Sequence, residues 1–200
     1  MEIENKRVLG LELPTDPRWV NMAEMSLEDI LTDHAYCEQK AATSCISLIQ
    51  KHPDLILLVD ALSPLVTEEW GHFRLVHKEL KRRNLNLGKQ RKDEYVNALQ
   101  LFVRKGVSPK DLLLDKLIVC AMIEARSCER FRLLSLYIND EGLKSFYHQF
   151  MVAEAAHYKL FLELAEHYSD ESAARKRWLE CLDFEAEILK NIIPRGDRMH

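Results

Sequence analysis

The chain has 200 residues, of which 47% are hydrophobic and only six are glycine and six proline, a composition that favours one domain of long helices. Its formal net charge of −4 gives no general reason to expect a nucleic-acid partner. The five cysteines form no C-x-x-C pair, which argues against a disulfide framework or a zinc ribbon and indicates a reducing compartment. The segment after Met1 lacks the apolar run of a secretory signal, and the longest apolar stretch is too short for a bilayer. We therefore expect a soluble, cytoplasmic protein without a membrane partner.

The first half of the chain predicts two helices in succession. After an extended segment marked by prolines, Ser26 is expected to cap a helix over about residues 26–51, because apolar residues then recur with helical spacing. A second helix is predicted over about residues 53–83. We expect Ser63-Pro64 to kink or restart this second helix, since serine is a favoured N-cap and proline a favoured first-turn residue.

The second half predicts a crossover followed by three further helices. The crossover covers about residues 84–107 and contains a short helix near 93–105. Ser108-Pro109 is expected to begin the next long helix. The remaining helices are predicted over about residues 109–137, 141–168 and 172–192, and the last of them is amphipathic and is expected to pack outside the others.

A carboxylate and histidine pattern occurs twice along these helices. In each copy a lone Glu is followed by a Glu-x-x-His unit, after 31 residues in the first copy and 30 in the second. A Glu and a His three residues apart lie on one face of a helix, so both can reach the same metal ion. Two lone Glu residues and two such units from four helices make the ligand set of a di-iron or di-manganese bundle. The candidate ligands are Glu38, Glu69, His72, Glu124, Glu154 and His157.

The turns of the predicted hairpins lie midway between the ligands of each copy. The first midpoint falls near Pro53 and the second at Asn139. Residues equally far from the turn of an antiparallel hairpin face each other, and each ligand would lie roughly 20 Å from its turn. This placement predicts an all-α, ferritin-like four-helix bundle with one long crossover and additional peripheral helices. We expect residues 1–200 to form this single domain.

The ligand types favour two divalent cations, because four buried carboxylates need neutralising charge. Imidazole with carboxylate suits iron, while manganese remains an alternative. Glu68 competes with Glu69 as a ligand, but only Glu69 has the three-residue spacing to His72. Cys128 follows Glu124 by one helical turn, and it is either a group that assists oxygen chemistry or a buried structural cysteine. The aromatic residues beside ligand positions, Tyr36, Trp70, Phe73 and Tyr158, are expected to serve mainly in packing.

A basic cluster lies at the end of the second predicted helix and the start of the crossover. Such a cluster can neutralise several phosphates of a nucleic acid. Alternatively, it is a helix C-terminus whose cations complement the macrodipole, followed by a solvated loop. The candidate nucleic-acid-binding residues in this cluster are Lys81, Arg82, Arg83, Lys89, Arg91 and Lys92.

Four segments around the candidate ligands carry a resemblance to a known family. They are Asp33 to Ala42, Glu68 to Phe73, Ile123 to Arg130 and Glu154 to Tyr158. Together with the chain length and the segment Leu13 to Val20, they resemble the tRNA 2-methylthio-isopentenyladenosine hydroxylase family. The resemblance implies a non-haem di-iron centre that uses dioxygen to hydroxylate the isopentenyl group of a hypermodified adenosine next to the anticodon. It also implies that the basic cluster contacts the anticodon stem-loop.

The expected function is therefore that of a tRNA-modifying monooxygenase with two iron ions and dioxygen as co-substrate. The sequence contains no G-x-G-x-x-G motif and no P-loop, so electrons are expected from an external reductase. Two alternatives remain open, namely a ferritin-like protein that binds and oxidises iron and a metal-free helical adaptor with solvated acidic pairs. The sequence does not indicate the oligomeric state.

Overall fold

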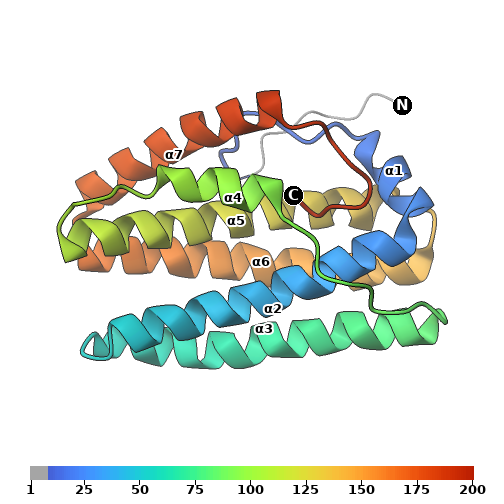
Figure 1. The fold of residues 1–200 in the computed structure, drawn as a ribbon, viewed down its shortest axis with the longest axis horizontal. Coiled ribbons are helices and arrows are strands. Elements are labelled where there is room, and N and C mark those ends of the chain that lie inside the picture. The colour runs from blue at the N-terminus through green and yellow to red at the C-terminus, as the bar shows by residue number, and fades with distance from the viewer. Residues whose placement is uncertain (1–8) are drawn as a thin grey trace. The chain divides into compact units, whose positions relative to one another are not determined.

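The computed structural model describes residues 9–200. Within this range the chain is helical, with one short 3-10 segment (Gln100–Phe102) and no strand (Figure 1). None of the helices in the described range is long and apolar enough to cross a membrane. The stretch Met1 to Arg7, interpreted above as lacking a secretory signal, lies outside the described residues. The helices are α1 (Trp19–Met25), α2 (Leu27–Lys51), α3 (Ile56–Arg82), α4 (Glu94–Leu99), α5 (Pro109–Tyr137), α6 (Glu141–Tyr168) and α7 (Glu171–Asn191).

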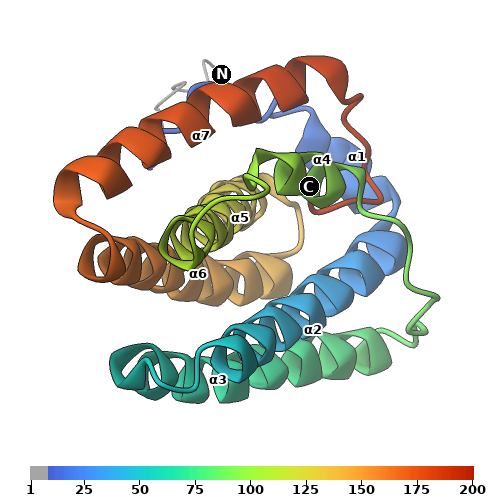
Figure 2. The same cartoon turned by 60° about the vertical axis from the view of Figure 1, so that its left-hand side comes forward.

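The chain divides into two compact units. One consists of Met22–Lys92 and Arg195–Met199 and is called the α2–α3 unit. The other consists of Met1–Asn21, Asp93–Pro194 and His200 and is called the α5–α6 unit. Each unit contains one pair of long helices that run antiparallel and pack along their length (Figures 1 and 2).

The α2–α3 unit is a helical hairpin with a short turn between Lys51 and Ile56. Ser26 is the residue before α2, as predicted, although its side chain makes no capping hydrogen bond. At the other end, Asn84 adopts a positive φ of 58° and the Leu85 N–H donates to the Leu80 carbonyl at 2.9 Å. Asparagine tolerates this left-handed conformation better than most residues, so it ends α3 at little cost.

The expectation that Ser63-Pro64 restarts the second helix is wrong, because α3 continues through both residues. Pro64 has no N–H, so the Asp60 carbonyl loses its helical hydrogen bond. Ser63 and Pro64 are exposed, as is Asp60, so water can donate a hydrogen bond to the Asp60 carbonyl. The Ser63 hydroxyl does not cap the helix but donates back to the Val59 carbonyl at 2.7 Å.

Two segments from later in the chain pack along α2. In the crossover, the Asn86 N–H donates to Glu28 at 2.8 Å and the Gly88 carbonyl accepts from the Tyr36 hydroxyl at 2.9 Å. In the C-terminal segment, the Met199 N–H donates to the Asp33 carboxylate at 2.8 Å. These contacts position the N-terminal half of α2, which carries the first candidate ligand.

The α5–α6 unit begins each long helix with a side-chain cap. Ser108, Asp140 and Asp170 accept hydrogen bonds from backbone N–H groups in the first turns of α5, α6 and α7. Helix α7 packs on both α5 and α6 and also contacts α4. Between α5 and α6, the Phe131 ring stacks on Tyr147 at a centroid distance of 5.7 Å and packs at a tilt of 52° against Phe150 at 5.5 Å.

Buried charges in this unit are paired with one another. Arg126 is fully buried and bonds Glu185 and Glu129, at 2.7 and 3.1 Å respectively. Glu129 also accepts from the N–H and hydroxyl of Thr15. Because each charge has an opposite charge beside it, the network ties α5, α7 and the N-terminal segment together without leaving a buried ion uncompensated.

The predicted elements differ from the observed ones mainly at the start of the chain. The helices predicted over 26–51, 53–83, 109–137, 141–168 and 172–192 are found at 27–51, 56–82, 109–137, 141–168 and 171–191. The short crossover helix predicted near 93–105 is α4 with the adjoining 3-10 turn, and it ends at Phe102. Helix α1 was not predicted, because its seven residues follow two prolines and lack an acidic first turn.

Candidate metal centre

The first copy of the ligand pattern converges on His72. Glu38 lies on α2, while Glu69 and His72 lie one turn apart on α3. The His72 Nδ1 atom is 3.4 Å from a Glu38 oxygen and 3.5 Å from a Glu69 oxygen. One ligand atom from each of the three residues lies within 4.8 Å of the others, as expected for donors that share an ion.

The electrostatics of this group favour a cation. Burial by itself would raise the pKa of Glu38, but hydrogen bonds from His34 and His72 outweigh it and hold the pKa well below its usual range. Burial likewise lowers the pKa of His72, but bonds to Glu38 and Glu69 raise it to about 10. Two buried carboxylates thus create a negative potential that attracts positive charge at this point.

The second copy converges on His157 in the same manner. Glu154 and His157 lie one turn apart on α6, with His157 Nδ1 3.9 Å from a Glu154 oxygen. Glu124, on α5, offers an oxygen within 4.8 Å of a His157 nitrogen. All three side chains are buried. The structure therefore brings together three of the six predicted ligands in each unit.

Glu68 and Glu69 differ in burial as their spacing predicts. Glu69 is only 1% exposed, whereas the Glu68 side chain is 51% exposed and lies 3.9 Å from His72 Nε2. Bulk water competes for the oxygens of an exposed carboxylate, so a buried carboxylate binds a metal ion more readily than an exposed one beside the same histidine. Glu69 is thus the better donor, and Glu68 is a flanking acid.

Sequence reasoning missed His34, which holds Glu38 in place. His34 is fully buried one turn before Glu38 on α2, and its Nε2 atom lies 2.7 Å from the Glu38 oxygen that faces away from His72. A hydrogen bond to a ligating carboxylate fixes its orientation and tunes its basicity. The i, i+4 spacing of His34 and Glu38 was the available signal.

Cys128 is engaged within the α5–α6 unit. Its thiol donates to the Met151 carbonyl on α6 at 3.4 Å. Burial, and then the Glu129 charge, raise the pKa of this thiol to about 11, so it stays protonated at neutral pH. These contacts favour a structural role, and the alternative role in oxygen chemistry remains a prediction.

The aromatic residues beside the ligands have packing partners within their own units. Trp70 stacks on Phe73 with ring centroids 4.7 Å apart, and Tyr158 packs against Trp178 at 5.5 Å. Tyr36 holds the crossover through its hydroxyl, as described above. Packing accounts for each of these positions.

The basic cluster falls into two groups. Arg82 and Arg83 both pair with Glu79, and Arg91 binds Asp29 and Asp197. By contrast, Lys81, Lys89 and Lys92 are exposed and have no ion-pair partner among residues 9–200. The first group holds the end of α3 and the crossover, and the second has charge available for another molecule.

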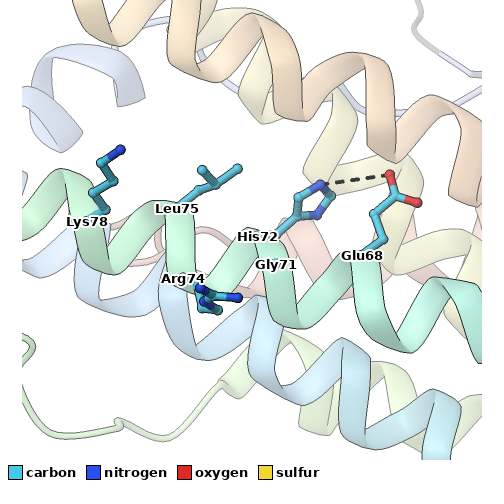
Figure 3. Close-up of a pocket in the computed structure, with 6 residues that line it drawn as sticks. All are labelled: Glu68, Gly71, His72, Arg74, Leu75 and Lys78. Carbon is cyan, nitrogen blue, oxygen red and sulfur yellow. Dashed lines mark ion pairs between the residues drawn. The ribbon is translucent and has the colours of Figure 1, made fainter.

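A hollow opens on the surface of α3 directly beside His72. It has a volume of about 580 Å³ and is lined by Glu68, Gly71, His72, Arg74, Leu75 and Lys78. Glu68, His72, Leu75 and Lys78 point to the same side of the helix (Figure 3). The imidazole of His72 is 12% exposed, so the hollow gives solvent access to one candidate ligand.

Comparison with known proteins identifies relatives over most of the chain. Residues 3–200 match the family model described as tRNA-(MS[2]IO[6]A)-hydroxylase (MiaE). The chain is 40% identical to a tRNA 2-(methylsulfanyl)-N(6)-isopentenyladenosine(37) hydroxylase of Pseudomonas putida over 162 residues, which cover 81% of this chain and 78% of the relative. It is 30% identical to the enzyme of the same name from Salmonella typhimurium, over 90% of this chain and 83% of the relative.

A solved structure resembles the chain equally broadly. It is Protein 43 with aldehyde deformylating oxygenase activity from Synechococcus, with a TM-score of 0.89 and 33% sequence identity. The likeness covers 95% of this chain and 94% of that protein. The prediction of an all-α, ferritin-like fold is confirmed.

Proposed function

This chain belongs to the MiaE family of tRNA hydroxylases, and we propose that its doubled ligand pattern is the centre at which the hydroxylation takes place. Membership makes the chain an oxidoreductase that acts on tRNA. Its substrate is 2-methylthio-N6-isopentenyladenosine beside the anticodon, and the isopentenyl group receives the hydroxyl. The observation that carries this proposal is the convergence of each Glu and Glu-x-x-His copy on its own histidine.

The proposed centre holds two iron ions with all six residues as ligands. The donor set fits, because four carboxylates and two imidazoles supply oxygen and nitrogen atoms suited to iron, and two divalent cations balance four negative charges. Five of the six side chains are buried, where uncompensated carboxylates would be costly. This proposal treats residues 1–200 as a single domain, as the sequence predicts.

Iron in such a centre supplies the activation of dioxygen. One oxygen atom enters the C–H bond of the isopentenyl group, and the other leaves as water with two protons and two electrons. An external reductase provides the electrons in this proposal. The protein side chains hold and orient the centre: His34 fixes Glu38, and the buried α5–α6 core keeps bulk water from Glu124 and Glu154.

The proposed tRNA contact is made by the lysines of the basic cluster. Lys81, Lys89 and Lys92 can neutralise phosphates of the anticodon stem-loop without breaking an ion pair among residues 9–200. Arg82, Arg83 and Arg91 stabilise the surface that presents them. The proposal includes a cytoplasmic location, which a tRNA substrate and five free cysteines support.

The decisive experiment is mass spectrometry of tRNA nucleosides from cells with and without this protein. The hydroxylated nucleoside should disappear when the gene is removed and return when it is restored. Restoring a Glu69→Gln variant should fail to return it. Equal amounts of the hydroxylated nucleoside in all strains would refute the proposal.

Binding of tRNA is tested separately with a variant in which Lys81, Lys89 and Lys92 are changed to glutamate. We expect weaker binding of the stem-loop and an unchanged iron content, because none of these lysines is near a ligand in its unit. The matched control reverses Lys51, an exposed lysine at the end of α2. Unaltered affinity of the triple variant would remove these lysines from the tRNA contact.

A further inference from the structure

The open face of α3 carries a regular stripe of residues. Glu68, Gly71, His72, Leu75 and Lys78 are spaced by three or four positions, which places them on one side of a helix (Figure 3). The helix rises about 1.5 Å per residue, so Lys78 lies roughly 9 Å along the axis from His72. The hollow is therefore elongated, with a candidate metal ligand near one end and a cation at the other.

Its size is that of a binding site for one small molecule. The volume of about 580 Å³ lies within the range of roughly 300–1,000 Å³ that is usual for small-molecule sites. One nucleotide fits such a volume, whereas a base-paired stem does not. An occupant drawn from tRNA must consequently be a single nucleotide turned out of the loop.

The charges along the stripe give the hollow a direction. Glu68 stands at one end, 3.9 Å from His72, and its exposed carboxylate is the one acidic group among the six residues that line the hollow. Lys78 stands at the other end, with Arg74 on the flank of the helix, and neither cation has an ion-pair partner among residues 9–200. A phosphate is repelled by the first end and attracted by the second.

The middle of the stripe is apolar and open. Leu75 is 47% exposed, so it offers apolar surface to an occupant of the hollow. Gly71 has no side chain, and a Cβ atom added there would meet no atom within 4 Å. A flat or apolar group can thus lie against the helix between Gly71 and Leu75.

We propose that this hollow receives the modified nucleotide, with its isopentenyl end at His72, its base along Gly71 and Leu75, and its phosphate at Lys78. This inference rests on the proposed function and adds to it a binding orientation, two residues that recognise the modification (Gly71 and Leu75) and one that binds the phosphate (Lys78). The orientation follows from the match between the polarity of the hollow and that of the nucleotide. The isopentenyl group is apolar and must approach the ligands, while the phosphate is anionic and must avoid Glu68.

The first test fills the hollow. Gly71→Phe adds a ring into open space, and Ser44→Phe adds the same ring at an exposed position on α2 as a control. Binding is measured without oxygen, using an anticodon stem-loop with and without the isopentenyl modification. Gly71→Phe should weaken binding of the modified stem-loop at least tenfold and the unmodified one less than twofold. Helicity and iron content should match those of the wild type.

The second test separates the two ends of the hollow. Lys78→Ala should weaken both stem-loops by roughly tenfold, because a charge-assisted contact to phosphate is lost. It should also reduce the slope of log affinity against log salt by about one. Leu75→Ser should weaken only the modified stem-loop, by roughly tenfold, since an apolar contact is lost. The Lys51→Ala control should change neither affinity.

These outcomes distinguish the inference from the proposed function. If the wild type binds the modified stem-loop better and Gly71→Phe abolishes that preference, the hollow is supported even should hydroxylation be absent. If the wild type hydroxylates the stem-loop and the Gly71, Leu75 and Lys78 variants do so with unchanged KM, the hollow is refuted while the function stands. A wild type that shows neither preference nor turnover would overturn both.

Discussion

The two helix pairs carry the same ligand pattern in different surroundings. In the α2–α3 unit, α3 buries few residues beyond its contact with α2, and its face from Glu68 to Lys78 is open. In the α5–α6 unit, α5 is buried on most of its sides between Leu113 and Leu134, and α7 lies against it. The difference shows that the same Glu and Glu-x-x-His pattern can occur on helices with different degrees of burial. In the proposed centre, the open pair gives access to the substrate and the enclosed pair supplies a rigid support.

The largest expected effect concerns the ligands, because the comparison assumes that both helix pairs bind the metal ions. Glu69→Gln and Glu124→Gln should each lower iron content and reduce hydroxylation by more than about 100-fold, since both remove a negative oxygen donor. The control is Glu163→Gln, which changes an exposed carboxylate on α6 that pairs only with Lys159 at 3.5 Å. Metal analysis and single-turnover assays provide the measurement. Full activity in either ligand variant would exclude a shared centre.

Loss of an ion pair should lower the unfolding free energy more in the enclosed helix pair than in the open one. Arg126→Ala removes the buried cation that bonds both Glu185 and Glu129, and should cost about 3–5 kcal/mol of unfolding free energy. Arg82→Ala removes an exposed arginine from Glu79, which keeps Arg83 as its partner, and should cost less than about 1 kcal/mol. Urea denaturation of both variants measures the difference. Equal losses would show that the enclosed network is not a special support.

The residues one turn before the lone Glu ligands sharpen the comparison further. His34 holds Glu38, whereas the equivalent position before Glu124 is Cys120, a thiol whose pKa is raised to about 12 by burial and then by the Glu124 charge. His34→Ala should weaken iron binding roughly 10- to 100-fold, as loss of an orienting partner does. Cys120→Ala should change it little.

Chelator competition measures iron affinity in both of these variants. A positioning role for His34 also requires that His34→Gln, which retains a donor, recover part of the lost affinity. Equal effects at the two positions would show that the hairpins orient their ligands alike.

The smallest effect concerns added volume on the two helices. Gly71→Leu on the open face of α3 should raise the unfolding free energy by about 0.5–1 kcal/mol, because glycine is a poor helix former and a Cβ atom added there meets no atom within 4 Å. Ala121→Leu in the enclosed α5 should lower it by about 1–3 kcal/mol through overpacking. Thermal denaturation measures both. Loss of stability in the Gly71 variant would mean that the face of α3 is covered.

Periodicity and capping residues predicted the long helices because those signals are local. Ser108, Asp140 and Asp170 each cap within three residues, so their effect can be seen in the sequence. The prediction that Ser63-Pro64 restarts a helix rested on an equally local signal, and it was wrong. A proline predicts a break from its own chemistry, but its cost depends on whether the carbonyl that loses its partner faces water, which the fold decides.

The features of the site also differ in whether a local sequence signal predicts them. The spacing of the ligands is local and was predictable, and their convergence within each unit follows from it. The pairing of Arg91 with Asp197 joins residues 106 positions apart, and no sequence pattern indicates it. The hollow beside His72 likewise has no sequence signal, because it depends on which part of the α3 surface the other described residues leave open. Absence of a neighbour has no signature in a sequence.

The hydrogen bond between Asp33 and Met199 bears on how the protein is made. These residues are separated by 166 positions, and Asp33 lies one residue before His34, the partner of Glu38. Because a ribosome synthesises the N-terminal part first, α2 leaves the ribosome long before the segment that completes its hydrogen bonding. The helix that carries the first ligand therefore gains this hydrogen bond only after residue 199 has been synthesised, and a nascent chain halted before that residue lacks the bond.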